Sequence, residues 1–220
     1  MRIGIHVRGF QAGKPVAVAR ALERGAETIQ IFASNPRGWK VSRFDTDADR
    51  AFVRQMREHD VGPLFIHAPY LVNLASPSAE FRRRSVSALR WAMERALALR
   101  AVGVVVHAGS AGSRRRGVAL RGVARAAGQV LGEGLAPALI LELTSGGAGS
   151  VASRLEEAAE VLDACDGYPR LRFCLDTCHL HAAGYDLRSA EGVAELMGKA
   201  RSLLGARRIA LIHANDSRDP

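Results

Sequence analysis

Residues 103–142 read GVVVHAGSAGSRRRGVALRGVARAAGQVLGEGLAPALILE. The run GVVVH at the start of this stretch is apolar and has the length of a strand, and ALILE at its end is a second such run. Between them, residues 115–131 carry Ala, Leu and Val at helical spacing. A strand, a helix and a second strand in this order predict two parallel strands joined by a right-handed crossover.

The same unit recurs along the chain at intervals of about 30 residues. Strands are predicted near residues 2–6, 27–32, 63–67, 103–107, 138–142, 171–176 and 208–213. Helices are predicted near 14–24, 46–59, 78–101, 115–131, 151–164 and 188–204. No linker or low-complexity tract divides the chain, so we expect one α/β domain covering residues 1–220.

The composition favours a globular protein that binds a polyanion. The hydrophobic content is 48%, and 31 Lys and Arg against 22 Asp and Glu give a net charge of +9. The three cysteines, Cys165, Cys174 and Cys178, are odd in number and favour buried apolar positions in a reducing compartment over disulfides. The sequence has no signal-like N-terminus and no apolar run of about 18 residues, so a cytoplasmic protein without a membrane span is expected.

Six of the seven predicted strands end in a polar residue that could bind a metal. Histidine is rare here, at 7 of 220 residues, yet four of these runs end on it. The carboxyl ends of parallel strands are where α/β proteins build their sites. The runs and their last residues are GIH at His6, FIH at His67, VVVH at His107, LILE at Glu142, FCLD at Asp176 and ALIH at His213.

The shape of the sheet decides whether these residues meet. Neighbouring strands lie about 4.8 Å apart, so in an open sheet the ends of the third and seventh strands would be roughly 19 Å apart. Metal ions that act together on a phosphate lie about 3.5 to 4 Å apart. A shared metal site therefore requires the sheet to curl, and we predict a (β/α)8 TIM barrel, here with about seven βα units because the sequence stops after the seventh strand.

Mixed His, Asp and Glu ligands favour zinc, with manganese as a second possibility. Glu142 lies between strands that supply His, so its two oxygens are suited to bridging two ions, and we predict that it is the catalytic residue. Such ions activate water for hydrolysis of a phosphodiester. His179 is predicted to serve a neighbouring metal, whereas His6 is either a ligand or a hydrogen-bond donor to one. His59 and His181 are interpreted as surface and incidental residues.

Five segments of the chain resemble successive signature segments of the endonuclease IV family, in register along nearly its whole length. They are IHAPYLVNLASP from Ile66, VVHAGS from Val105, LELTSGGAGS from Leu141, LDTCHLHAAGYDLRS from Leu175 and LIHANDS from Leu211. The resemblance implies a (β/α)8 barrel with up to three zinc ions. It also implies cleavage of double-stranded DNA 5′ to abasic sites, which leaves a 3′-hydroxyl.

The resemblance also assigns roles to single residues. It makes His67, His107 and Glu142 the ligands of one zinc, lets Glu142, Asp176 and His213 share a second, and gives His179 to a third. Arg37 in IFASNPRGW and Tyr70 in HAPY match residues with which the family enters the DNA base stack. An arginine and a tyrosine on loops beside the site suit that role, because extruding a nucleotide costs stacking energy. Nothing in the sequence indicates oligomers, so a monomer is expected.

Two departures from the family pattern stand out. The first loop, HVRGFQAGKP, is basic where the family has small, Gly-rich residues, and the chain ends at HANDSRDP. The family's Asp and His ligands to the third zinc and its late Glu ligand are not among the 220 residues. We therefore expect these residues alone to bind two zinc ions or fewer and to have weak nuclease activity.

Two other functions compete with the nuclease. Sugar isomerases and epimerases of the xylose-isomerase-like barrels also have His, Asp and Glu at strand ends, but they usually need a Lys or Glu acid and base near the metals. No lysine stands at a predicted strand end here. A non-catalytic protein that binds damaged DNA is the other possibility, and salt-dependent binding without cleavage would identify it.

Overall fold

The computed structural model describes residues 1–11, 14–32, 34–41, 43–165 and 168–217. Within these residues, seven parallel strands form one sheet in the order β1-β4-β5-β6-β7-β8-β9. The strands are β1 (Gly4–His6), β4 (Thr28–Phe32), β5 (Leu64–His67), β6 (Gly103–His107), β7 (Ala138–Glu142), β8 (Leu171–Asp176) and β9 (Ile209–His213). Every predicted strand is present within two residues of its predicted bounds.

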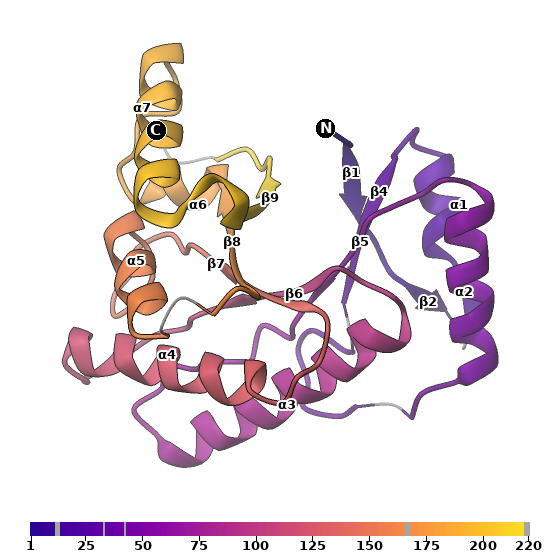
Figure 1. Cartoon of the computed structure of the whole chain (residues 1–220), viewed down its shortest axis with the longest axis horizontal. Helices are drawn as coiled ribbons and strands as arrows, with labels where there is room; N and C mark the ends of the chain where they lie inside the picture. The colour runs from indigo at the N-terminus through magenta and orange to yellow at the C-terminus, as the bar shows by residue number, and fades with distance from the viewer. Residues whose placement is uncertain (12–13, 33, 42, 166–167, 218–220) are drawn as a thin grey trace.

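Helices follow the strands and cover the outer face of the sheet (Figure 1). They are α1 (Ala17–Leu22), α2 (Thr46–Glu58), α3 (Ala79–Ala98), α4 (Arg116–Leu131), α5 (Leu155–Asp163), α6 (Thr177–Ala182) and α7 (Ala190–Leu204), with a 3-10 turn at Ala206–Arg208. Six of the seven correspond to predicted helices, whereas α6 lies where the sequence predicts none. Among the described residues, no helix is both long and apolar enough to cross a membrane.

The first helix begins later than the sequence predicts. The first two residues of the predicted helix form β3 (Lys14–Pro15), which pairs antiparallel with β2 (Phe10–Gln11), and α1 begins only at Ala17. Pro15 has no backbone N–H to donate, which suits it to a short strand edge or turn. The basic first loop is therefore partly a hairpin, although Ala12 and Gly13 lie outside the described residues.

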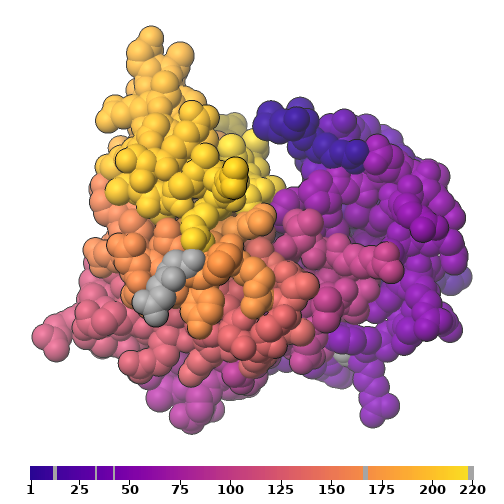
Figure 2. All heavy atoms as spheres, viewed as in Figure 1, coloured from indigo at the N-terminus to yellow at the C-terminus, as the bar shows by residue number. Residues whose placement is uncertain are grey.

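The sheet curls into a barrel wall that is open on one side. β1 and β9 are its two edge strands, and they face one another across the opening (Figure 1). Figure 2 shows the corresponding hollow between the N-terminal and C-terminal segments of the surface. The TIM-barrel prediction is thus confirmed, with seven strands of the barrel described.

Two hydrophobic layers hold this wall in place, because successive side chains of a strand point to opposite faces. Leu64, Ile66 and Val104 belong to the large cluster between the sheet and the helices. Phe65, Val105 and Ile140 belong to a smaller cluster inside the barrel, together with Cys174. The residue two places further along each of these strands points the same way, so the last residues of β5, β6, β7 and β8 point into the barrel.

Candidate metal centre

Glu142 lies at the centre of four imidazoles at the carboxyl ends of the strands. Its Oε2 is 3.3 Å from Nε2 of His67 and 3.3 Å from Nε2 of His107. Its Oε1 is 3.2 Å from Nδ1 of His179 and 3.2 Å from Nδ1 of His213. The side chains of β5, β6, β7 and β9 thus meet as predicted, with Glu142 only 1% exposed.

The His67 side chain is held in one orientation by its neighbouring backbone. Its Nδ1 is 2.6 Å from the carbonyl oxygen of Ala68, so Nδ1–H donates there and Nε2 keeps a lone pair. That lone pair faces Glu142 Oε2, which is buried and has no hydrogen-bond donor among the described residues. Two acceptors pointing at each other in a buried site repel unless a cation lies between them.

The donor set therefore fits a divalent metal. His67, His107 and Glu142 each offer one ligand atom, and these atoms lie within 4.8 Å of one another. Ligands at about 2.0–2.1 Å from a tetrahedral zinc are roughly 3.3–3.4 Å apart, which agrees with the 3.3 Å from Oε2 of Glu142 to each imidazole nitrogen.

A second group lies on the other side of Glu142. Nδ1 of His213 is 3.6 Å from Oδ2 of Asp176, and Nδ1 of His179 is 3.9 Å from Oδ1 of the same carboxylate. Glu142, Asp176 and His179 form one compact set of possible ligands, and Glu142, Cys174 and His213 form another. All six predicted ligand residues thus surround one small volume, and their assignment to individual ions remains a prediction.

The local charges are strongly coupled. Burial alone would raise the pKa of Glu142, but the four imidazoles around its carboxylate, those of His107, His179, His213 and His67, hold it far below its usual range. Burial lowers the pKa of His213, but hydrogen bonds with Asp176, Cys174 and Glu142 outweigh it and raise the pKa to about 12. Burial raises the pKa of the Cys174 thiol to about 11, so this thiol stays protonated unless a metal displaces its proton.

The succession of βα units agrees with the comparisons to known proteins. Residues 18–220 match the family of xylose isomerase-like TIM barrels. The chain is 39% identical over 221 residues to the probable endonuclease 4 of Streptomyces coelicolor, a match that covers 99% of this chain and 75% of the relative. The chain belongs to the endonuclease IV family.

Other comparisons support membership of this family of DNA-repair nucleases. A probable endonuclease 4 from Halothermothrix orenii is 34% identical over 99% of this chain and 78% of its own length. The crystal structure of endonuclease IV from Thermus thermophilus superposes with a TM-score of 0.86 and 34% identity, covering 99% of this chain and 77% of that one. The chain thus spans about three quarters of the length of these endonuclease IV proteins.

An epimerase-like protein has the same fold as this endonuclease IV family member but is less similar in sequence. A D-tagatose 3-epimerase-like protein superposes with a TM-score of 0.75 at 20% identity, which establishes the shared barrel alone.

The cavity at the open side of the barrel has a volume of about 570 Å³ and is lined by His6, His67, Glu142 and Asp176, among other residues. Among the described residues that line it there is no lysine.

The two residues predicted to contact DNA lie on neighbouring loops of the endonuclease IV barrel. Tyr70 is 55% exposed, and its ring lies 5.4 Å from that of His67 and 5.1 Å from that of Phe32. Its backbone N–H donates to the carbonyl of Pro36 in the loop that carries Arg37. Arg37 is exposed, with its backbone N–H bonded to Asn35.

Three residues that the sequence analysis does not single out as site residues complete the endonuclease IV centre. Asn215 donates from Nδ2 to Asp176 Oδ2 at 2.5 Å, and Cys174 offers its sulfur close to His213. Gln30 on β4 contacts both His213 and His6. A polar residue inside the apolar strand TIQIF is the available signal for Gln30.

The two histidines interpreted as surface and incidental residues lie away from the Glu142 cluster. His59 is exposed at the end of α2. His181 is half-buried on α6, and its Nε2 lies 3.5 Å from Arg188. Neither belongs to a described group of possible metal ligands.

Proposed function

We propose that this chain is a zinc-dependent endonuclease that acts as a monomer on double-stranded DNA. It would hydrolyse the phosphodiester 5′ to an abasic site and leave a 3′-hydroxyl. The observation that carries the proposal is the position of Glu142, whose oxygens each lie 3.2–3.3 Å from two imidazole nitrogens. Manganese is the alternative metal, because imidazole and carboxylate ligands suit both ions.

The ligand assignment that we propose places His67, His107 and Glu142 on one ion. Glu142, Asp176 and His213 would share a second, and His179 would bind a third. Zinc supplies Lewis acidity, which activates water near neutral pH and neutralises charge on the phosphate. Glu142 would then be the catalytic carboxylate, because it alone among the described ligands reaches both sides of the cluster.

Other contacts in the site would set the orientation and the charge of its histidines. The Ala68 carbonyl holds His67 in the tautomer that leaves Nε2 free. Leu143 accepts a hydrogen bond from Nδ1 of His179 at 3.0 Å, so that this proton must leave if Nδ1 is to bind a metal. Burial and the nearby His67 and His213 lower the pKa of His6 to about 4, so His6 is neutral and adds no charge.

The net positive charge of the chain and the exposed ring of Tyr70 both support DNA as the substrate. The net charge of +9 favours binding to polyanions through counterion release. Tyr70 presents an exposed ring beside His67, where a base or an extruded sugar would stack. The described cavity lining contains no lysine, and its carboxylates Glu142 and Asp176 are assigned here to the metals, which favours the nuclease over an epimerase that needs a separate acid and base. The odd number of cysteines and their clustering late in the sequence support a reducing cytosol as the compartment.

The proposal is tested with a duplex that contains a tetrahydrofuran abasic analogue. Single-turnover conditions are appropriate because residues 1–220 are expected to act slowly. We expect incision 5′ to the lesion that a chelator abolishes, a product that a polymerase extends, and two zinc ions or fewer per chain by elemental analysis. Incision that survives metal removal would refute the mechanism, and salt-sensitive binding without any incision would identify a non-catalytic binder.

Tyr70 offers a separate test of DNA recognition. Replacement of Tyr70 by Ala is expected to weaken binding to the abasic duplex by roughly 5- to 150-fold, because stacking on an aromatic side chain contributes about 1–3 kcal/mol. Tyr70→Phe keeps the ring and should bind like the parent. Fluorescence anisotropy measures both affinities, and Tyr168→Ala, an exposed tyrosine that does not line the metal cavity, is the matched control. Equal losses in Tyr70→Ala and Tyr168→Ala would argue against a role in recognition.

A further inference from the structure

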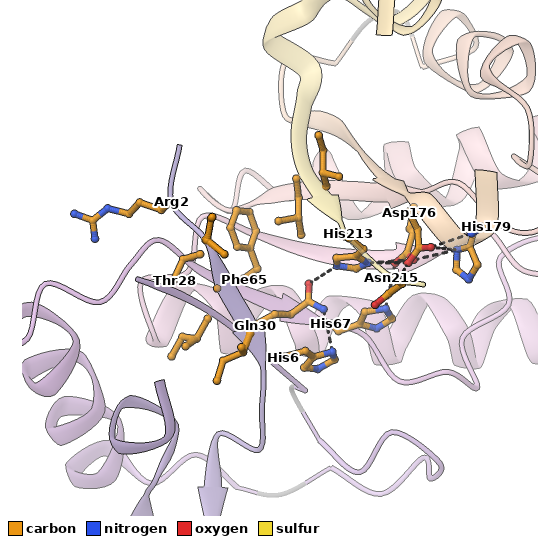
Figure 3. Close-up of a pocket in the computed structure, with 18 of the residues that line it drawn as sticks. Arg2, His6, Thr28, Gln30, Phe65, His67, Asp176, His179, His213 and Asn215 are labelled. Carbon is orange, nitrogen blue, oxygen red and sulfur yellow. Dashed lines mark hydrogen bonds and ion pairs between the residues drawn. The ribbon is translucent and has the colours of Figure 1, made fainter. Parts of the chain in front are cut away.

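Gln30 links the two edge strands of the barrel across its open side. Its side chain is buried, and it extends from β4 between His6 on β1 and His213 on β9 (Figure 3). Oε1 of Gln30 is 3.1 Å from Nε2 of His213, and Nε2 of Gln30 is 3.1 Å from Nδ1 of His6. Because β1 and β9 are not paired with each other, these two hydrogen bonds join the edges at the level of the metal centre.

The direction of this hydrogen-bond chain follows from the chemistry of the amide. A glutamine oxygen only accepts and its nitrogen only donates. His213 must therefore carry a proton on Nε2, and His6 must accept on an unprotonated Nδ1. Once a metal displaces the Nδ1 proton of His213, the hydrogen bond from Nε2 to Gln30 keeps the ring in place and leaves the Nδ1 lone pair directed toward Glu142 and Asp176, at 3.2 and 3.6 Å.

We propose that Gln30 is a positioning residue of the metal centre, which fixes the tautomer and ring orientation of His213 so that Nδ1 binds metal. This inference rests on the proposed metal-dependent function and deepens it. Metal-binding histidines are commonly oriented by an acceptor on the other ring nitrogen, and loss of that acceptor lowers metal affinity by about 10- to 100-fold. Here the acceptor comes from β4, on the far side of the barrel opening.

His6 would act as the anchor that keeps the amide the right way round. Its ring is stacked at 5.8 Å on that of His67 and lies 4.4 Å from that of Phe32, so its orientation is set by packing. If the amide were reversed, its nitrogen would face His213 and favour a proton on Nδ1, where the metal belongs. The sequence leaves His6 as either a metal ligand or a hydrogen-bond donor to a ligand. The structure favours a third role, in which His6 orients Gln30 and Gln30 orients the ligand His213.

Two substitutions separate the hydrogen-bond role from packing. Gln30→Met keeps the length of the side chain but removes the acceptor, and it is expected to weaken Zn²⁺ binding by about 10- to 100-fold. Gln30→Glu keeps an oxygen opposite His213, and a shift of the His6 proton to Nδ1 lets that nitrogen donate to the second oxygen, so Zn²⁺ affinity should stay within a few fold of the parent. Competition with a chromophoric chelator measures the affinities of the full 220-residue chain. Gln129→Met, the same change at an exposed site on α4, is the matched control.

Histidine ¹⁵N NMR gives a second readout, which reports the tautomer of His213 directly. In the zinc-loaded parent chain, His213 should carry its proton on Nε2, protected from exchange with solvent; the signal should persist in Gln30→Glu and be lost in Gln30→Met. A proton on Nδ1 of His213 in the parent, or parental affinity in Gln30→Met, would overturn the inference while leaving the metal centre intact. A parent chain that binds no Zn²⁺ at all would overturn the proposed function, and this inference with it.

Discussion

Replacement of Glu142 by Gln is expected to empty the metal centre. Glu142 is the only residue of the described cluster whose oxygens reach both pairs of imidazoles. Its loss should lower zinc affinity by more than the roughly 10- to 100-fold that follows loss of an outer hydrogen-bond partner. Dialysis followed by elemental analysis should find less than one zinc per chain, and incision of abasic duplex should fall to the chelated background.

The same substitution should leave the fold intact. The new amide nitrogen would donate a hydrogen bond to the lone pair of His67, which removes the repulsion that exists without a cation. Glu157→Gln is the matched control, because Glu157 is also a buried carboxylate but binds Arg116 and Ser153 on the outer side of the barrel. We expect that control to lose stability and keep its zinc. Parental zinc content in Glu142→Gln would contradict the bridging role.

The positions of the strand-end residues could be predicted because they depend on local periodicity. Each strand alternates inward and outward side chains, so Phe65 and His67, or Ile140 and Glu142, point into the barrel together. The point at which an apolar run turns polar marks the carboxyl end of a strand. Curling of the sheet then follows from the requirement that these ends share one volume.

The role of Gln30 could not be predicted in this way. Its partners are His6 and His213, and the latter lies 183 residues away in the sequence. They come together only because the curled sheet brings its two edges close. The sequence carries a weak signal, a polar residue in the middle of TIQIF, but no local pattern names its partner.

The helix α6 escapes prediction for a different reason. It is only six residues long, too short for helical periodicity to be recognised. Asp176 caps it by accepting a hydrogen bond from the backbone N–H of His179 at 2.9 Å. The cap places His179 beside the carboxylate of Asp176. The sequence pattern therefore identifies His179 as a site residue but does not predict the helix that positions it.

Of the substitutions considered, Arg95→Met is expected to destabilise the fold most, by about 3–5 kcal/mol in the free energy of unfolding. Arg95 on α3 pairs with Asp49 on α2, and both side chains are at most one tenth exposed. Oδ1 of Asp49 already lacks a hydrogen-bond partner among the described residues. Removal of the guanidinium would therefore leave a buried carboxylate that has no other ion pair among the described residues.

Arg95 also ties the first loop to the barrel. Its guanidinium carbon lies 5.0 Å from the ring centre of Phe10 on β2 and 5.2 Å from that of Phe44. Each cation–π contact contributes about 0.5–2 kcal/mol when it is shielded from water. Loss of both should loosen the β2–β3 hairpin next to His6, and hydrogen exchange of the Phe10 amide should accelerate in Arg95→Met.

Urea denaturation of further variants tests whether the stability loss in Arg95→Met comes from the buried charge of Asp49 rather than from the loss of an arginine in general. Arg90→Met, on the same helix, breaks the more exposed pair with Glu133 and should cost less than about 1 kcal/mol. The double variant Asp49→Leu with Arg95→Met removes both charges and should recover most of the stability, because apolar replacement of a buried pair is often neutral. A double variant no more stable than Arg95→Met would show that the unpaired charge of Asp49 does not cause the stability loss. The lost contacts of Arg95 with Phe10 and Phe44 would then account for it.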